Sequence, residues 1–329
     1  MSQTFRVLTE DDVRSALAGV DLVQLMDDAL RAFSERSVVQ PIRTAVFVGR
    51  EPSVLGLMPA YLPSRSALGA KLVTVFNGNH ALGLPTHFAT VLLFDDKTGA
   101  LAAVMDGSHI TEVRTPAVSA VAVRHLAKKP VRRLALFGCG VQARSHLRTL
   151  AADVASLDEV RVWSPYGDRE AFIEAMRKVV PVRLVEATSG KDAARDADLV
   201  VLVTSSPEPV ILHGWVSPGS LVISVGACRR DHREMDPDLV ASARVFVDSR
   251  DAALVESGDI VQGVAAGRFG AGHLSGELGD VILGRVAVRE SDDDVVVFKS
   301  LGLAVEDIAV ADLVYRHAVA TNQGVDLTV

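Results

Sequence analysis

The spacing of apolar residues changes along the first 126 residues, from a helical period to short strand-like runs and back. Residues 10–17 and 22–33 carry apolar side chains at helical spacing, and Thr9 precedes the first segment as an N-cap. Between residues 44 and 107, Gly, Pro, Asn and Asp separate five short apolar runs, which predict strands: AVFVG, GLMPAYL, AKLVTVFN, FATVLLFD and ALAAVMDG. The segment 95–99 predicts a hairpin turn, and residues 111–126 predict a long helix.

From residue 131 onward the pattern alternates between apolar strands and helices. The predicted strands are 132–137, 159–163, 183–186, 199–204, 221–225 and 244–247. Val, Leu and Ile run almost continuously through them, which is typical of strands covered on both faces. The alternation predicts a doubly wound parallel sheet.

One turn in this region carries a ligand-binding pattern. In LALFGCGVQARSHL (134–147), Gly138, Gly140 and Ala143 have the G-x-G-x-x-A spacing of a dinucleotide-binding turn. Gly138 permits the tight turn, Gly140 lets a pyrophosphate approach the backbone, and Ala143 lets the helix pack closely on the strand. With Val141 and Gln142 at the start of the helix, they are the predicted phosphate-binding residues. The alternative is a glycine turn without a ligand.

The next strand bears on the choice of cofactor. An Asp or Glu at its end binds the ribose of NAD, but here the strand ends in Ser164-Pro165-Tyr166. Arg169 follows, and Arg144 lies in the first turn of the phosphate helix. These residues favour NADP(H) over NAD(H), although both arginines also fit ordinary solvated positions. Thr204 and Ser205 end the fourth strand, where they are expected to touch the nicotinamide ribose; Ser205 also fits a helix cap.

The sequence predicts two domains. A strand-rich domain would comprise residues 1–127 and 299–329, and a Rossmann-type NAD(P)-binding domain would comprise residues 128–298. The segment 298–315 predicts an apolar helix that starts after Ser300 and packs on the first domain. The fold class is therefore α/β, with a Rossmann-type domain inserted in a strand-rich α+β domain.

Composition excludes several classes of function. A net charge of −7 with interspersed signs gives no reason to expect nucleic acid or an anionic membrane as a partner. The first residues lack the apolar core of a signal peptide, and no apolar run is long enough to span a bilayer. The two cysteines, Cys139 and Cys228, lack metal-ligand spacing. We therefore expect a cytoplasmic protein without a bound metal or a disulfide scaffold.

Three cations stand out in apolar surroundings: Arg43, Lys71 and Arg114. Burying a charge costs free energy unless a partner compensates it, and a carboxylate ligand gripped by these groups is one explanation. From spacing alone, side chains that reach back to water are the better explanation for each of them. His87, beside a Gly-Leu-Pro turn, could face such a site or bond to the backbone.

The segments 71–107 and 110–127, the glycine turn and FKSLGLAVEDIAVADL resemble the ornithine cyclodeaminase/mu-crystallin family, over nearly the full length. The motifs are Asn77-Gly78-Asn79 and Gly83-Leu84-Pro85-Thr86-His87, followed by Arg114-Thr115. The resemblance implies a homodimer built through the strand-rich domain and hydride transfer to or from C=N bonds of amino and imino acids. It also implies that Arg43 and Arg114 bind the substrate carboxylate, that Lys71 is catalytic, and that Thr115 contacts the cofactor.

One departure from the family pattern bears on the reaction. Cys228 stands where the ornithine cyclodeaminases carry an aspartate, and a thiol does not replace a carboxylate as a partner for a distal amine. The chain therefore resembles the ketimine reductase side of the family. The expected activity is reduction of a small cyclic imino carboxylate such as pyrroline-2-carboxylate or piperideine-2-carboxylate. The alternatives are an ornithine cyclodeaminase, an alanine-type amino-acid dehydrogenase, and a non-catalytic NADP-binding ligand carrier like mu-crystallin.

Overall fold

The chain divides into two units within one continuous helix. The computed structural model describes residues 3–49, 53–128 and 130–329. The first unit runs to Arg114 and resumes at Leu303, and the second spans Thr115–Gly302, so the break falls inside α3 (Ser108–Leu126). These limits differ from the predicted domain limits at residues 127/128 and 298/299, which stay a prediction.

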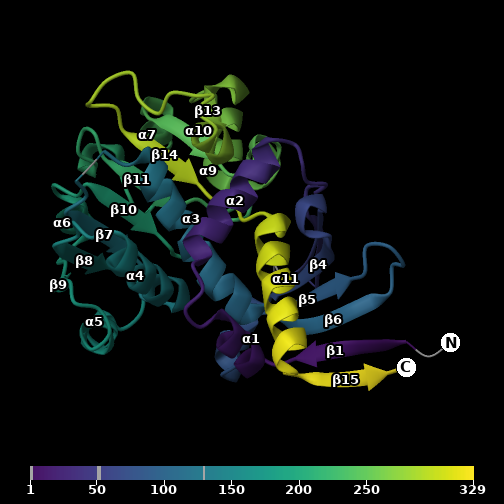
Figure 1. Cartoon of the computed structure of the whole chain (residues 1–329). Coiled ribbons are helices and arrows are strands. Elements are labelled where there is room, and N and C mark those ends of the chain that lie inside the picture. The colour runs from purple at the N-terminus through teal and green to yellow at the C-terminus, as the bar shows by residue number, and fades with distance from the viewer. Residues whose placement is uncertain (1–2, 50–52, 129) are drawn as a thin grey trace. The chain divides into compact units, whose positions relative to one another are not determined.

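A mixed sheet is the framework of the first unit. In the described residues, its seven strands have the order β15-β1-β6-β5-β4-β3-β2 (Figure 1). They are β1 (Thr4–Leu8), β2 (Thr44–Val48), β3 (Ser53–Leu62), β4 (Ala67–Val75), β5 (His87–Phe94), β6 (Leu101–Asp106) and β15 (Val325–Thr328). β1 pairs with β6 in parallel, and the other neighbours are antiparallel. The five strands predicted between residues 44 and 107 are confirmed; β1 and β15, at the two ends of the chain, were not predicted.

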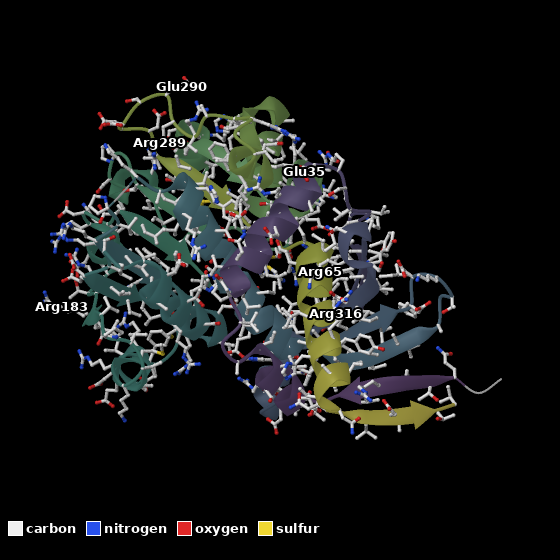
Figure 2. All side chains as sticks on the ribbon, viewed as in Figure 1. Glu35, Arg65, Arg183, Arg289, Glu290 and Arg316 are labelled. Carbon is white, nitrogen blue, oxygen red and sulfur yellow. The ribbon has the colours of Figure 1, made fainter. Side chains whose placement is uncertain are left out.

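Helices of the first unit pack beside this sheet. α1 (Glu10–Leu17) begins at Thr9, whose hydroxyl accepts from the Asp12 N–H while the Asp12 carboxylate accepts from the Thr9 N–H. The predicted cap is therefore confirmed. α11 (Ala304–Thr321) packs against β3, β4 and β5 and against α2 (Leu22–Ser34). Asp312 of α11 accepts from Arg65 and Arg316, both labelled in Figure 2.

The start of α11 differs from the prediction for a physical reason. The helix was expected directly after Ser300, but it begins at Ala304. The N–H groups of Leu301 and Gly302 donate instead to the buried carboxylate of Asp248, at 2.5 and 2.6 Å. Gly302 also has a positive φ of 82°. These contacts end β14 and keep residues 301–302 out of the helix.

The second unit is built on a parallel sheet. In the part of the chain that the structure describes, eight strands have the order β13-β12-β14-β11-β10-β7-β8-β9. They are β7 (Arg133–Phe137), β8 (Glu159–Trp163), β9 (Arg183–Glu186), β10 (Leu199–Leu202), β11 (Leu221–Ser224), β12 (Arg244–Val247), β13 (Leu274–Glu277) and β14 (Val296–Lys299). The helices are α4 (Val141–Asp153), α5 (Arg169–Arg177), α6 (Gly190–Ala194), α7 (Pro237–Ser242), α8 (Arg250–Glu256), α9 (Gly258–Ala265) and α10 (Leu278–Ile282), besides the second part of α3.

The strand order predicts where this sheet would bind a ligand. β8 and β9 extend from one side of β7, and β10, β11 and β14 extend from the other. The order therefore reverses between β7 and β10, and the carboxyl ends of these two strands flank the crevice where such sheets bind ligands. The predicted doubly wound α/β fold is confirmed, although β13 and β14 were not predicted.

A buried histidine joins α3 to α4 within this unit. The hydroxyl of Ser119 lies 2.9 Å from Nε2 of His146, and Nδ1 of His146 lies 2.8 Å from the carbonyl oxygen of Gln142. His146 is fully buried, and burial lowers its pKa to about 4. A neutral imidazole with a proton on Nδ1 satisfies both contacts, so the ring stabilises α4 in its uncharged form.

Candidate active site and cofactor site

Lys71 occupies a position that is normally apolar. It lies in the middle of β4, opposite Met58 of β3 and Val91 of β5, and it shares their buried side of the sheet. The residue is only 2% exposed. An ammonium at such a depth requires compensation by charge or hydrogen bonds.

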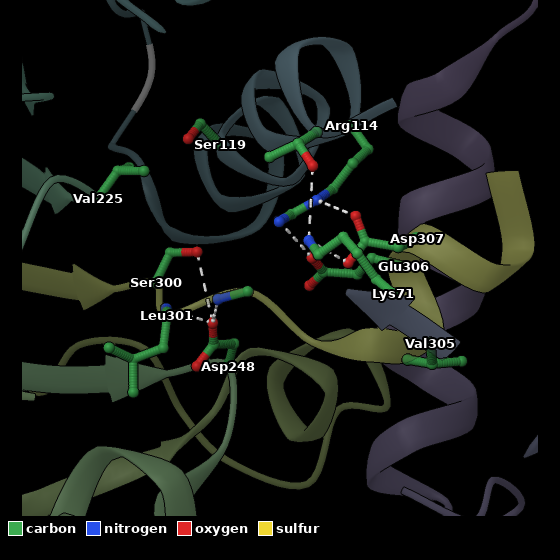
Figure 3. Close-up of polar contacts among 12 residues, drawn as sticks. Lys71, Arg114, Ser119, Val225, Asp248, Ser300, Leu301, Val305, Glu306 and Asp307 are labelled. Atoms are coloured by element: carbon green, nitrogen blue, oxygen red, sulfur yellow. Dashed lines mark hydrogen bonds and ion pairs between the residues drawn. The ribbon is translucent and has the colours of Figure 1, made fainter. Parts of the chain in front are cut away.

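Two carboxylates in the first turn of α11 supply that compensation. Nζ of Lys71 lies 2.6 Å from Oδ2 of Asp307 (Figure 3). Nε of Arg114 donates to Oδ1 of Asp307 at 3.0 Å, and its Nη1 donates to Oε2 of Glu306 at 2.8 Å. Asp307 therefore bridges the lysine and the arginine, and both acidic side chains are fully buried.

Thr111 adds a polar contact one helical turn before Arg114. Nζ of Lys71 lies 3.5 Å from the Thr111 hydroxyl oxygen, and that hydroxyl donates to the carbonyl oxygen of Gly107 at 2.8 Å. The amino-terminal part of α3 and the first turn of α11 thus approach the same lysine, and all of these residues belong to the first unit.

Burial and neighbouring charges perturb the acid–base behaviour of the cluster. Burial lowers the pKa of Lys71 to about 8, with Arg114 and Arg43 adding to the effect and Asp307 opposing it. Burial, together with Lys71 and Arg114, lowers the pKa of His87 to about 4. Burial alone would raise the pKa of Asp307, but Arg114 and Lys71 outweigh it and hold that pKa below its usual value.

A third cation acts on this cluster. Arg43, half-buried before β2, lowers the pKa of Lys71 together with Arg114. The structure thus brings Arg43, Lys71 and Arg114 together, as the sequence suggested. The roles of Glu306 and Asp307 were missed; the available signal was an acidic pair in an otherwise apolar helix.

The glycine turn of the second unit fits the pyrophosphate of a dinucleotide. Gly138 has a φ of 123°, and a Cβ atom there would lie 2.8 Å from the carbonyl oxygen of Val203. Gly140 is the N-cap of α4 without a side-chain hydrogen bond, and a Cβ atom there would meet nothing within 4 Å. Ala143 is fully buried, whereas Val141 is exposed. The space beside Gly140 is therefore open, and a phosphate could reach the first N–H groups of α4 there.

The residues after β8 form a connected group. The Ser164 hydroxyl donates to the carbonyl oxygen of Tyr166. Arg169 contacts the Ser164 carbonyl oxygen at 3.4 Å and forms an ion pair with Glu186 at 3.0 Å. Arg144 stacks on the ring of Phe172 in α5, 5.3 Å from its centroid. Both arginines thus contact side chains or backbone around the β8–α5 connection.

The carboxylate that follows β8 most closely is committed to the helix. Asp168 is the N-cap of α5, and Oδ1 accepts from the N–H of Ala171 at 2.9 Å. It therefore stabilises the start of α5.

Thr204 is hydrogen-bonded to a buried carboxyl group. Its N–H and its hydroxyl both donate to Oε1 of Glu234, each at 2.7 Å. Ser205 is exposed, and Thr115 is buried at the start of the second unit. Their cofactor contacts, and that of Gln142, stay predictions.

Cys228 follows β11 and makes weak sulfur contacts, donating to the carbonyl oxygens of Val225 at 3.3 Å and Leu301 at 3.9 Å.

Among the described residues, no cluster of three His, Cys, Asp or Glu could hold a metal ion. None of the helices described reaches the length and apolar content that a bilayer crossing requires.

Comparison with known proteins places these two sites in a family context. The chain is 40% identical over 313 residues to the ketimine reductase mu-crystallin of Rattus norvegicus, an alignment that covers 94% of this chain and 96% of the relative. The Thermococcus litoralis Δ1-pyrroline-2-carboxylate reductase in complex with NADH and L-proline has a similar structure, with a TM-score of 0.91, 31% identity and coverage of 98% and 100%. An archaeal alanine dehydrogenase dimer with bound NAD has a TM-score of 0.90, 30% identity and coverage of 99% of both chains. A family model matches residues 4–322, and the chain belongs to the ornithine cyclodeaminase/mu-crystallin family.

Proposed function

We propose that this chain is an NAD(P)H-dependent oxidoreductase that reduces the C=N bond of a small ketimine carboxylate. The observation that carries the proposal is the buried cluster of Lys71, Arg114, Glu306 and Asp307, in which one carboxylate holds a lysine and an arginine together, with Arg43 acting on the same lysine. The glycine turn with a helix N-terminus beyond it supports a dinucleotide, and relatives named as ketimine and pyrroline-2-carboxylate reductases support the reaction class.

In the proposed mechanism, Arg43 and Arg114 bind the substrate carboxylate and so fix the position of the neighbouring C=N bond. Lys71, with a pKa of about 8, is mostly protonated at neutral pH and donates a proton to the imine nitrogen. A bound reduced nicotinamide would supply the hydride to the imine carbon. Hydride and proton together convert C=N into CH–NH. Asp307 holds the ammonium of Lys71 in place and supports its charged form.

The proposed substrates are cyclic ketimines such as pyrroline-2-carboxylate and piperideine-2-carboxylate. The relative that binds L-proline, the reduced product of such a ring, supports this choice. Cys228 in place of an acidic residue disfavours cyclodeamination of ornithine. Oxidation of NADPH or NADH by a panel of cyclic and linear imino acids tests the proposal, and release of ammonia from ornithine without net redox change would indicate a cyclodeaminase instead.

Two other candidates remain distinct from this one. The alanine dehydrogenase neighbour favours a dehydrogenase of a linear amino acid. Such an enzyme would oxidise NADPH or NADH with a linear imino acid but not with a cyclic one. A non-catalytic ligand carrier would bind the dinucleotide and show no turnover. The charged cluster with a lysine of pKa about 8 favours an enzyme over a carrier.

For the cofactor, we propose NADP(H) over NAD(H). Arg144 and Arg169 lie around the β8–α5 connection, and Asp168 is committed to its helix cap. A 2′-phosphate could bind these two guanidinium groups, with Arg169 exchanging its ion pair with Glu186 for the phosphate. The solved neighbours hold NADH and NAD, so parallel assays with both dinucleotides are the test.

We propose a homodimer formed through the sheet of the first unit. Strand alternation and register place Leu57 beside Leu72, and Phe88 beside Thr74, on the side opposite the buried face of Lys71. Leu57 is 36% exposed and Phe88 is 46% exposed, although both belong to central strands. A second copy would cover this apolar face.

Sedimentation of the wild type as a dimer and of Phe88→Glu as a monomer is the expected result. Val179→Glu, at a similarly exposed position of the second unit, is the matched control and should remain dimeric. A monomeric wild type would exclude this assembly.

A further inference from the structure

The second unit contains a buried charged network to which the proposed function gives no role. Glu234, Asp259 and Lys299 have side chains that are almost or completely inaccessible to solvent. Lys299 is the last residue of β14, and Glu234 and Asp259 lie in or beside the segments that follow β11 and β12. Buried charges of this kind cost free energy, so the contacts they make are informative.

Glu234 ties together the ends of two parallel strands. Its Oε1 accepts from the N–H and the hydroxyl of Thr204, which follows β10, each at 2.7 Å. Its Oε2 accepts from the N–H of Gly226 at 2.7 Å and from the hydroxyl of Ser224 at 3.0 Å, both at the end of β11. A Cβ atom at Gly226 would lie 1.9 Å from the Thr204 carbonyl oxygen, so the two strand ends are in close contact. Burial raises the pKa of this carboxyl, whereas Lys299 and the Thr204 donors favour its charged form.

Asp259 and Lys299 complete the network. Oδ1 of Asp259 accepts from the N–H groups of Glu234 and Met235, each at 2.9 Å, and its Oδ2 lies 3.2 Å from Nζ of Lys299. Nζ of Lys299 also donates to the Ser224 hydroxyl at 3.0 Å. β10, β11 and β14 thus end on one connected group of side chains.

Acidic groups outnumber the ammonium in this network. One ammonium stands against two carboxylates, and Asp248, which follows β12, is a further buried carboxylate that contacts backbone N–H groups and Ser300 (Figure 3). The second unit therefore keeps fixed negative charge at the carboxyl ends of its β10–β11–β14 half.

The β10–β11–β14 half of the sheet is where the nicotinamide end of a dinucleotide would lie. The glycine turn follows β7, and the ribose-recognition position follows β8, so the adenosine end belongs to β7, β8 and β9. The other mononucleotide half, beginning at β10, faces the remaining end of the cofactor. An oxidised nicotinamide ring carries a positive charge that the reduced ring lacks.

We infer that the Glu234–Asp259–Lys299 network positions the β10 and β11 ends beside the nicotinamide and that its net negative charge favours the oxidised, cationic ring. Glu234 and Asp259 are positioning residues. They favour the oxidised cofactor, which is formed in the reaction, because the negative charge of the network is already in place before hydride transfer. The inference rests on the proposed use of a nicotinamide cofactor, but not on the identity of the imino acid.

The test measures dissociation constants of NADP⁺ and NADPH without substrate for the wild type, Glu234→Gln and Asp259→Asn. Each variant removes one negative charge at nearly constant size. The ratio of the NADP⁺ to the NADPH dissociation constant should rise roughly three- to tenfold in both variants. Ser224→Ala is the matched control, because it removes hydrogen bonds of the same network without changing its charge, and its ratio should stay within about twofold of the wild type.

The outcomes separate the possibilities. If both dissociation constants rise equally in Glu234→Gln and Asp259→Asn, the network is only structural and the inference is overturned. Asp259→Asn alone carries the test if Glu234→Gln does not fold, because the same ratio is measured. A wild type that binds neither NADP(H) nor NAD(H) would overturn the proposed function and this inference together.

Discussion

Asp307 lies 2.6 Å from Lys71, so the ammonium proposed as proton donor is paired with a buried carboxylate before any substrate arrives. The same carboxylate accepts from Arg114 at 3.0 Å. Asp307 therefore fixes the spacing between the proton donor and the arginine proposed to bind the substrate. This arrangement makes the site sensitive to a change of charge at one position.

Asp307→Asn should destabilise the protein strongly, because it leaves two buried cations with less compensation. We expect a loss of about 3–5 kcal/mol in the free energy of unfolding, measured by urea titration. Asp312→Asn, on the same helix, removes a carboxylate whose partners Arg65 and Arg316 are partly exposed, and it should cost about 1 kcal/mol or less. Similar losses of unfolding free energy in the two variants would show that the buried pairing of Asp307 contributes no more to stability than the partly exposed pairing of Asp312.

The pH dependence of turnover should report Lys71. Since the proton donor must be charged and its pKa is about 8, kcat/KM for imine reduction should fall as the pH rises through 8. In Asp307→Asn the falling limb should move to lower pH, because Asp307 supports the charged form of Lys71. A limb that stays in place in that variant would assign the ionisation to another group, such as the substrate nitrogen.

Lys71→Met should abolish most of the turnover while it leaves NADPH binding intact. Loss of a proton donor commonly costs about 10²–10⁴-fold in rate. NADPH oxidation and NADPH dissociation constants are measured side by side, and Lys97→Met, in the exposed hairpin turn, is the control. Turnover at the wild-type rate would remove Lys71 from the mechanism.

The glycine turn and the central strands could be predicted from sequence because their signals are local. Gly138, Gly140 and Ala143 lie within six residues, and strands such as Leu199–Leu202 are continuous apolar runs between turns. The pairing of Arg114 with Asp307 joins positions 193 residues apart, and nothing near either residue indicates its partner. The resemblance to a family suggested the roles of the cations. Their carboxylate partners, Glu306 and Asp307, became visible only in the fold.

Tertiary contacts also explain where local interpretation failed. The sequence after Ser300 has helical spacing, but the Asp248 carboxylate captures the N–H groups of Leu301 and Gly302. Glu234 accepts from both the N–H and the hydroxyl of Thr204, a pairing that no local pattern in the sequence indicates. In each case a buried carboxylate from a distant segment decides the local geometry.

Acid should destabilise the fold through His146. The pKa of His146 is about 4 in the folded state, and its ordinary value is 6.5. Between these two pH values the unfolded chain therefore binds a proton at this histidine and the folded chain does not. This contribution is fully present above about pH 6.5 and falls by about 3 kcal/mol by pH 4.

His146→Gln should show a shallower decline of unfolding free energy between pH 7 and pH 4 than the wild type, by about that amount. Urea titrations across this range provide the measurement. Parallel declines in the two proteins would mean that other groups, such as His87, carry the acid sensitivity.

The most direct test of the central claim is the loss of NADPH absorbance with pyrroline-2-carboxylate and piperideine-2-carboxylate, run in parallel with NADH. The account predicts rapid oxidation with at least one of these cyclic ketimines, faster with NADPH than with NADH, and formation of the corresponding cyclic amino acid. Tight dinucleotide binding without oxidation by any imino acid would contradict it, and would leave a ligand-binding protein in place of a reductase.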